Sequence, residues 1–225
     1  LTYLSCHSNQ LTALDVSVNT ALTHLYCYSN QLTSLDVSAN TALEELRCHS
    51  NQLTYLNMRN GVTDSLTIFD ATNNPNLTCI EVLDPDWATV NWTSANGNID
   101  AGVTFAVICG GTDLTTWHVD TTGSDGSGSG TSTSPLATIQ TGINAATESD
   151  TVSVAAGTYE EQVQFNSKNI SLIGQDSSNT IIKWNGGIAV SLENGLTSHT
   201  PHIKNFTIKD GYSDTAGGIL ISNYE

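Results

Sequence analysis

The chain has 225 residues, enough for one large domain or two modest ones. Only 12% of the residues are charged, while Ser, Thr, Asn and Gly are abundant, and this composition favours a β-rich fold over a long helical one. Acidic residues outnumber basic ones by 22 to 6 and the deficit runs through both halves, so neither half offers a basic patch and nucleic acid is excluded as a partner.

Three near-identical 21-residue segments open the chain: LTYLSCHSNQLTALDVSVNTA (1–21), LTHLYCYSNQLTSLDVSANTA (22–42) and LEELRCHSNQLTYLNMRN from Leu43 onward. A unit this short cannot bury its own apolar face, so the copies must stack as coils of a solenoid. Each unit contains two L-T-x-L halves joined by Asn-bearing corners. Asn suits a corner because its side chain satisfies turn backbone groups and it tolerates left-handed dihedrals. The corner residues are Asn9, Asn19, Asn30, Asn40 and Asn51.

The pattern L-x-x-L-x-C-x-x-N resembles the leucine-rich repeat family, in particular the short Leu/Cys/Asn repeats of secreted bacterial surface proteins. The resemblance implies a solenoid whose first sheet forms a concave, ligand-facing side. In Leu66–Asn74, Phe69 and Ala71 replace the Leu and the Cys, and the following stretch NPNLTCIEVLDPDWATVNW loses the period. This predicts a terminal capping repeat that closes the open core.

The cysteines form two groups. Cys6, Cys27 and Cys48 share one repeat position and are predicted to point inward, about 5 Å apart from coil to coil. In-register side chains on parallel strands do not converge on one tetrahedral point, so we expect buried free thiols that fill space and no metal site. For the remaining Cys79 and Cys109, the resemblance implies a disulfide in a Cys-bearing cap, and hence an oxidising, extracytoplasmic location.

Alternation along the first-half strands predicts one outward face of aromatic, His and Arg side chains. The candidate binding residues are Tyr3, His7, His24, Tyr26, Tyr28, Arg47 and His49. Ser5 and Glu45 are predicted to point outward on the same strands. Such residues carry binding energy at interfaces, but aromatic residues also favour strands that bind nothing, and both interpretations stay open. A metal site made of His7 and His49 is not expected, because they lie two coils or about 10 Å apart with Tyr28 between them.

The second-half columns consist of small and polar residues and predict a plain outer face. They are Ala13, Asp15 and Ser17 in the first unit and Ser34, Asp36 and Ser38 in the second.

The composition shifts at Gly111–Pro135, where a short strand-like WHVD (117–120) precedes a Gly/Ser-rich segment. Asp120 and Asp125 hint at Ca²⁺, but the spaced run of carboxylates that such sites use is missing, so a mobile polar loop is predicted. A helix is then predicted with Ser134 as N-cap and Pro135 as its first residue. Its apolar face consists of Leu136, Ile139, Ile143 and Ala146, and Gly142 weakens it by roughly 1 kcal/mol.

Seven Val- and Ile-rich runs follow, bounded by Gly, Asn and Asp and too irregularly spaced for tight hairpins. They are Thr151–Ala155, Glu161–Phe165, Asn169–Gly174, Thr180–Trp184, Gly187–Asn194, Lys204–Gly211 and Gly217–Asn223. Together with W-H-V-D and the stretch D-T-V…G-T-Y, this half resembles the N-terminal part of pectin-lyase-like right-handed parallel β-helices. The resemblance implies an amphipathic helix that plugs the open end of the core.

The fold expected from these patterns is mainly β and has two domains. Residues 1–110 form a leucine-rich repeat solenoid with a C-terminal cap, and residues 111–225 form the N-terminal part of a right-handed parallel β-helix with an N-terminal capping helix. We expect the chain to be a fragment, because both ends fall inside repeating structure. It shows no signal peptide and no apolar run that could span a bilayer.

Catalysis within this half is the weaker interpretation. Enzymes of the pectin-lyase-like class use an Arg or Lys base with Ca²⁺, or clustered Asp residues. The residues after Gly110 contain no Arg, and Glu193, Asp210 and Asp214 lack the family signatures, so they are interpreted as turn and solubility residues. No catalytic residue, cofactor or metal is predicted.

The preferred functional hypothesis is a secreted or cell-surface binding or adhesion protein. It would recognise a protein or glycan through the repeat face, with the second half as a stalk or glycan-binding module. The alternative is a polysaccharide lyase or glycoside hydrolase whose catalytic coils lie beyond residue 225. A structural surface-layer element is a third hypothesis.

Overall fold

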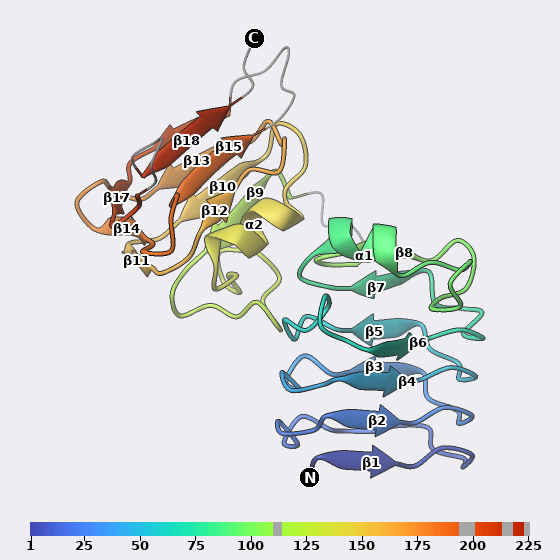
Figure 1. Cartoon of the computed structure of the whole chain (residues 1–225). Coiled ribbons are helices and arrows are strands. Elements are labelled where there is room, and N and C mark those ends of the chain that lie inside the picture. Colours follow the sequence, from blue (N-terminus) through green and yellow to red (C-terminus); the bar gives the residue numbers. More distant parts are fainter. Residues whose placement is uncertain (110–113, 194–200, 213–217, 223–225) are drawn as a thin grey trace. The chain divides into compact units, whose positions relative to one another are not determined.

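The computed structural model describes residues 1–109, 114–193, 201–212 and 218–222 (Figure 1). Within these residues the fold is a mainly β solenoid with two short helices, α1 (Pro85–Asn91) and α2 (Ile139–Ala145). The chain divides into two compact units, Leu1–Gly111 (unit 1) and Thr112–Glu225 (unit 2). The domain boundary predicted at residue 110 lies outside the described residues. Over the described ranges, neither helix has the length and apolar character that crossing a membrane requires.

Unit 1 is a stack of coils with two parallel four-stranded sheets (Figure 1). The first sheet has the order β1 (Tyr3–Ser5), β2 (His24–Tyr26), β4 (Glu45–Arg47) and β6 (Ile68–Asp70). The second has the order β3 (Ser34–Asp36), β5 (Tyr55–Asn57), β7 (Cys79–Glu81) and β8 (Thr104–Ala106). Equivalent repeat positions pair directly, as Tyr3 does with His24 and His24 with Glu45, so the repeat fixes the register.

The core between the two sheets is built from rows of equivalent side chains. Cys27 and Cys48 are fully buried, while Cys6 on the first coil is partly buried. Phe69 and Ala71 continue the Leu and Cys rows into the fourth coil. The buried leucines of the repeat rows are Leu22, Leu25, Leu32, Leu35, Leu43, Leu46, Leu53 and Leu56. The rows predicted from the repeat are therefore present.

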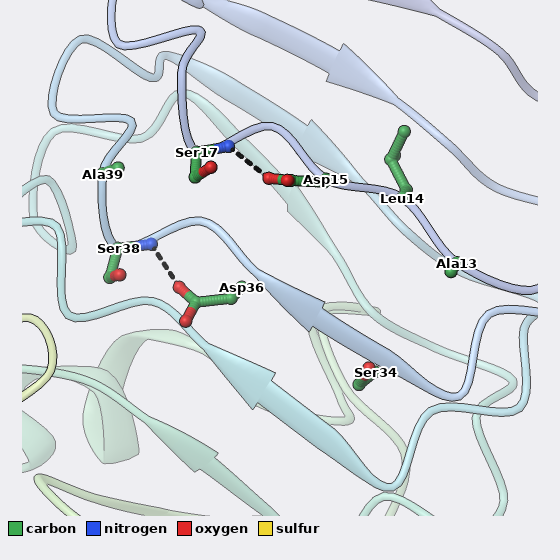
Figure 2. Close-up of a pocket in the computed structure, with 8 residues that line it drawn as sticks. All are labelled: Ala13, Leu14, Asp15, Ser17, Ser34, Asp36, Ser38 and Ala39. Atoms are coloured by element: carbon green, nitrogen blue, oxygen red, sulfur yellow. Dashed lines mark hydrogen bonds between the residues drawn. The ribbon is translucent and has the colours of Figure 1, made fainter.

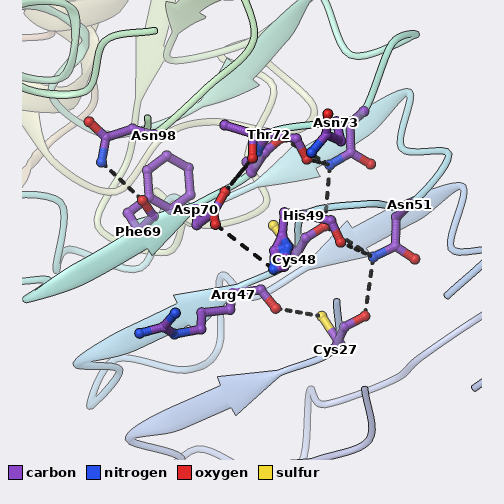
Figure 3. A network of polar contacts seen from close by, with 12 residues as sticks. Cys27, Arg47, Cys48, His49, Asn51, Phe69, Asp70, Thr72, Asn73 and Asn98 are labelled. Atoms are coloured by element: carbon purple, nitrogen blue, oxygen red, sulfur yellow. Dashed lines mark hydrogen bonds and ion pairs between the residues drawn. The ribbon is translucent and has the colours of Figure 1, made fainter. Parts of the chain in front are cut away.

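Asn side chains join each coil to the one before it. The Asn51 amide donates to the carbonyls of Cys27 (3.1 Å) and Cys48 (3.0 Å), and its oxygen accepts from the Leu32 amide (3.0 Å); Figure 3 shows the donated bonds. Asn30 and Asn74 make the same contacts one coil earlier and later. The left-handed conformation at these corners belongs to the preceding residue, at Ser8, Ser29, Ser50 and Asn73. The side chain of the corner Asn can therefore hydrogen-bond the backbone of its own coil and of the coil before it.

The residues after the repeats close unit 1 with a strand, a helix and a second strand. Helix α1 is capped by Asp84, whose carboxylate accepts a hydrogen bond from the Trp87 amide (3.0 Å). Immediately after it, Trp92 lies 4.2 Å from Phe69 and 5.9 Å from Phe105, ring centroid to centroid. Strands β7 and β8 extend the second sheet, and the disulfide between Cys79 and Cys109 is present beside them.

Unit 2 carries three parallel sheets, and successive coils contribute successive strands to each (Figure 1). The first contains β9 (Thr116–Val119), β10 (Thr151–Val154), β13 (Ser171–Gly174) and β16 (His202–Lys204). The second contains β11 (Gly157–Tyr159), β14 (Thr180–Lys183) and β17 (Thr207–Lys209). The third contains β12 (Val163–Gln164), β15 (Val190–Glu193) and β18 (Ile219–Ser222). Each of the seven predicted runs contains one strand, whereas β11 and most of β16 were not predicted.

Helix α2 begins later than predicted. Its N-cap is Thr138, whose side chain accepts from the Thr141 amide, and not Ser134. The reason is that Leu136 is extended beside β9: its amide donates to the His118 carbonyl and its carbonyl accepts from the Asp120 amide, both at 2.9 Å. These bonds remove Leu136 from the helix while leaving it fully buried.

Charged side chains from the following coils bind both ends of α2. At the N-terminus, the two Glu161 carboxylate oxygens accept from the amides of Ile139 (2.8 Å) and Gln140 (2.9 Å). At the C-terminus, the Lys168 ammonium donates to the carbonyls of Ile143 (2.9 Å) and Ala146 (3.0 Å). Each charge has the sign that the helix dipole favours.

The Gly/Ser-rich segment is hydrogen-bonded to the extended strand that follows it, in contrast to the mobile loop predicted. Asp125 accepts from the Ala137 amide and from the Thr138 hydroxyl, both at 2.7 Å. Asp120 accepts from the Thr122 amide at 2.8 Å, and this bond lowers the pKa of the carboxyl. Asp120 therefore serves a local turn, and Asp125 joins the Gly/Ser-rich segment to the residues that precede α2.

Candidate binding face

The outward side chains of the first sheet form a grid, which we call the aromatic face. Strand alternation turns Leu4, Leu25, Leu46 and Phe69 toward the core and leaves the residues on either side of them outside. From the first coil to the fourth, the rows are Tyr3, Ser5 and His7; His24, Tyr26 and Tyr28; Glu45, Arg47 and His49; and Ile68, Asp70 and Thr72. All seven candidate residues named from the sequence lie on this one face.

One column of the aromatic face is a continuous stack of three rings. The His7 and Tyr28 rings lie 4.3 Å apart and nearly parallel, and the Tyr28 and His49 rings lie 4.5 Å apart. At the far end, His49 Nε2 is 3.9 Å from a carboxylate oxygen of Asp70. Both faces of the Tyr28 ring are therefore covered by imidazoles, and the ring offers its edge to a ligand.

The central column is organised around Tyr26. Its hydroxyl donates to Glu45, and this hydrogen bond is the main reason that the pKa of Tyr26 is raised. The Arg47 guanidinium carbon lies 5.5 Å from the centre of the Tyr26 ring, within cation–π range. Tyr3 contacts the same ring edge to face at 5.4 Å, and His24 Nε2 is 3.7 Å from Glu45.

The two carboxylates of the aromatic face are thus held by their neighbours. Glu45 is bound by Tyr26 and approached by His24. Asp70 accepts from both the amide (3.1 Å) and the hydroxyl (2.7 Å) of Thr72, as Figure 3 shows. These contacts fix the side chains in place before any ligand arrives.

A metal centre is not visible among these groups. In residues 1–109, 114–193, 201–212 and 218–222, no three His, Cys, Asp or Glu side chains are grouped so that they could hold a metal ion. The Tyr28 ring separates His7 from His49.

The opposite, second-half face contains a groove where the sequence predicted a plain surface. It has a volume of about 360 Å³ and is lined by Ala13, Leu14, Asp15, Ser17, Ser34, Asp36, Ser38 and Ala39 (Figure 2). Asp15 and Asp36 each accept a bond from the amide two residues later, at Ser17 and Ser38 (both 2.9 Å). The groove therefore offers small side chains and two carboxylates that already serve turns.

A buried ion pair beside the disulfide was missed by the sequence analysis. Arg59 Nη2 lies 3.2 Å from Glu81 Oε2, and both side chains are 5% exposed. The same carboxylate accepts from the Tyr55 hydroxyl (3.2 Å) and the Cys109 amide (3.1 Å). Burial, and secondarily Glu81, raises the pKa of Tyr55 to about 12. The signal in the sequence was the break in the repeat at Asn57-Met58-Arg59, where earlier units have Asp-Val-Ser.

Of the acidic residues considered for catalysis in unit 2, Asp210 is the one whose side chain is described. Asp210 is exposed and takes a left-handed turn conformation, with φ of 64°, directly after β17. Asp214 lies outside the described residues, and so does the side chain of Glu193.

Comparison with known proteins gives one similar structure. No protein-family model matches the chain, and neither does any curated protein. Among solved structures, the chain is similar to the functional domain of InlJ from Listeria monocytogenes, described as including a cysteine ladder. The identity is 21% and the TM-score 0.33, over 92% of this chain and 54% of that one, so the chain spans about half of that structure's length.

Proposed function

We propose that this chain belongs to a secreted or cell-surface protein and that unit 1, as a leucine-rich repeat solenoid, binds a protein ligand through the aromatic face. The observation that carries the proposal is the ordered grid itself. Tyr, His and Arg side chains from consecutive coils are immobilised against one another on a single sheet face, and such residues dominate binding energy at interfaces. The disulfide supports an oxidising compartment.

The arrangement of the rings favours a protein over a glycan. Sugar recognition by stacking needs an open aromatic face against which the sugar can lie. In the stack, both faces of Tyr28 are occupied, and Tyr26 is covered by Arg47 and contacted by Tyr3. The aromatic face instead presents ring edges and polar groups, which suit the hydrogen-bonding groups of a protein surface.

For unit 2 the proposal is a parallel β-helix that acts as a stalk, with α2 as its capping helix. Support comes from the three parallel sheets and from the residues of α2 that are buried, Ile139, Thr141, Gly142 and Ile143. The proposed division into residues 1–110 and 111–225 is close to that of the two compact units.

The test is a binding screen against arrayed extracellular proteins and, in parallel, a glycan array. The variant Tyr26→Ala, Tyr28→Ala and His49→Ala removes the centre of the aromatic face, and Ser34→Ala with Asp36→Ala on the opposite face is the matched control. We expect protein hits that the first variant loses and the control keeps, with circular dichroism showing both to be folded. Hits that survive the first variant, or hits confined to glycans, would refute the proposal.

A further inference from the structure

We propose that Arg47 is the anchor of the aromatic face and that it receives a carboxylate from an acidic segment of the protein ligand. This inference deepens the function proposed above and rests on it. It follows from a difference between the hydrogen-bonding groups of the aromatic face: some already have a partner within the protein, and others have none.

The carboxylate acceptors of the aromatic face are in use. Glu45 accepts from Tyr26 and faces His24, while Asp70 accepts twice from Thr72 and faces His49. A ligand that approached with donors would have to displace these bonds. The carboxylates of the aromatic face therefore organise their own neighbours and are poor contacts for a cationic ligand.

Two donors of the aromatic face, the Arg47 guanidinium and the Tyr28 hydroxyl, are open. Within the described residues, the Arg47 guanidinium has no hydrogen bond and no ion pair, only the contact with the Tyr26 ring. In Figure 3 no dashed line reaches it, and it extends away from the Cys27 and Cys48 side chains of the core. Over the same ranges, the Tyr28 hydroxyl, one coil away, also has no partner.

Arg47 also differs in charge from its surroundings in unit 1, where acidic residues predominate. It and Arg59 are the two Lys or Arg residues in the first 110 positions, and Arg59 forms a buried ion pair with Glu81. The Tyr26 ring holds the guanidinium on one side, which lowers the entropy lost when a ligand binds. A planar guanidinium with free N–H groups matches a carboxylate in a two-bond geometry, so the ligand group assigned here is an Asp or Glu side chain.

The test uses hexaglutamate as the probe for the full chain, with hexaglutamine and a sulfated hexasaccharide as comparison probes. Binding is followed by ¹H–¹⁵N NMR, with the Arg47 Nε–H resonance as the local reporter. The experiment is done at about 0.15 M salt, where a Debye length near 8 Å screens the chain's net charge of −16. Arg47→Gln removes the anchor. Lys204→Gln, on exposed β16 in unit 2, removes the same charge elsewhere and is the matched control.

We expect hexaglutamate, and not hexaglutamine, to shift the Arg47 resonance saturably. Arg47→Gln should weaken hexaglutamate binding about tenfold or more, and Lys204→Gln should leave it unchanged. No shift at Arg47, equal loss in both variants, or a response to the sulfated hexasaccharide alone would each overturn the assignment.

The protein-array hits separate this inference from the proposed function. If Arg47→Gln loses them together with the Tyr26, Tyr28 and His49 variant, both proposals are supported. If the triple variant loses the hits but Arg47→Gln keeps them, the binding face stands and the anchor fails. If both variants keep them, the proposed function itself fails.

Discussion

Cys6, Cys27 and Cys48 occupy one repeat position but differ in environment because only the first lies on an end coil. Burial raises the pKa of Cys27 to about 12 and that of Cys48 well above its ordinary value. It also raises the pKa of Cys6, but this thiol is only partly buried and stays accessible to solvent. The nucleophile is the thiolate, so a pKa change from 9.0 to about 12 lowers the reactive fraction of Cys27 about 10³-fold at neutral pH.

We therefore predict that a thiol reagent such as Ellman's reagent modifies Cys6 first in the native chain at pH 8. Cys27 and Cys48 should react only at the rate at which unit 1 opens. In denaturant all three should react together, and Cys6→Ser should remove the fast phase. Three equally fast phases in the native chain would show that the Cys row is not buried.

The Arg59–Glu81 pair offers a second test at the level of single residues. Arg59→Met should destabilise unit 1 by about 3–5 kcal/mol, because it leaves the Glu81 carboxylate buried without its cation. Adding Glu81→Gln should recover a large part of the loss. Urea unfolding provides the measurement, and Arg47→Met, at the half-buried surface, should stay within about 0.5 kcal/mol. A loss of similar size at Arg47 would contradict this account.

Some single residues could be predicted from the sequence and others could not. The Leu and Cys rows follow from a period that recurs three times, and no other arrangement buries them. Arg59 could not be paired in advance, because its partner Glu81 comes from a stretch where the period is lost. The left-handed conformation was assigned to the corner Asn, because Asn adopts it more often than Ser, whereas the structure has it at the preceding Ser.

At the level of elements, the close approach of α2 to the sheet explains its central glycine. A Cβ on Gly142 would lie 2.9 Å from methyl groups of both Val119 and Val152. Gly142→Ala should therefore destabilise unit 2 by about 1–2 kcal/mol, although Ala is the better helix former by about 1 kcal/mol. Combined with Val152→Ala, the change should show favourable coupling of about 1 kcal/mol in a double-mutant cycle. Stabilisation by Gly142→Ala alone would mean that the helix packs less closely.

Glu161, at the N-terminus of α2, provides a pH-dependent test. Burial raises the pKa of this carboxyl above its ordinary value of 4.5, against the lowering effect of its bonds to Gln140 and Ile139. Between the unfolded and the folded pKa, the folded chain binds the proton more tightly, so stability falls as pH rises. The contribution of Glu161 is thus largest below pH 4.5 and is lost as pH rises through the folded pKa.

The measurement is the unfolding free energy of unit 2 in the unchanged chain and in Glu161→Gln, from pH 4 to pH 7. The difference between the two should become less favourable to the unchanged chain as pH increases. An opposite trend would mean that the two amide bonds, and not burial, dominate the pKa.

The start of α2 shows why element boundaries escaped the sequence analysis. Ser134-Pro135 is a good local start signal, and Leu136 fits the apolar period of the helix. The backbone at β9, which hydrogen-bonds Leu136, is distant in the sequence. These hydrogen bonds form only in the folded chain, so the local sequence does not predict them.

For the whole molecule, the disulfide is predicted to support unit 1 alone. Cys79 and Cys109 are separated by 30 residues, and a loop of this length corresponds to about 3–4 kcal/mol in the loop-entropy model. Reduction, or Cys79→Ser with Cys109→Ser, should speed amide hydrogen exchange in unit 1 and leave unit 2 unchanged. Cys6→Ser is the matched control. Unchanged exchange in unit 1 would show that the bridge contributes nothing to stability.

At this scale, repetition made the solenoid of unit 1 predictable from sequence, since identical units must stack in register. The candidate binding residues were also predictable as a set, because strand alternation places them on one side. Their mutual contacts were not: ring stacking, the bond from Tyr26 to Glu45 and the open guanidinium of Arg47 depend on side-chain conformations that no period encodes.

The constant pairing of equivalent positions from coil to coil has an evolutionary consequence. Each of the first three rows of the aromatic face is encoded by one 21-residue segment, while the Leu and Asn residues that build the coil recur in every copy. In-frame duplication or unequal crossing-over between segments can therefore add, delete or exchange one row at a time without disturbing its neighbours. Under the proposed function, the specificity of the aromatic face would be inherited one coil at a time, and recombination could change it as readily as point mutation.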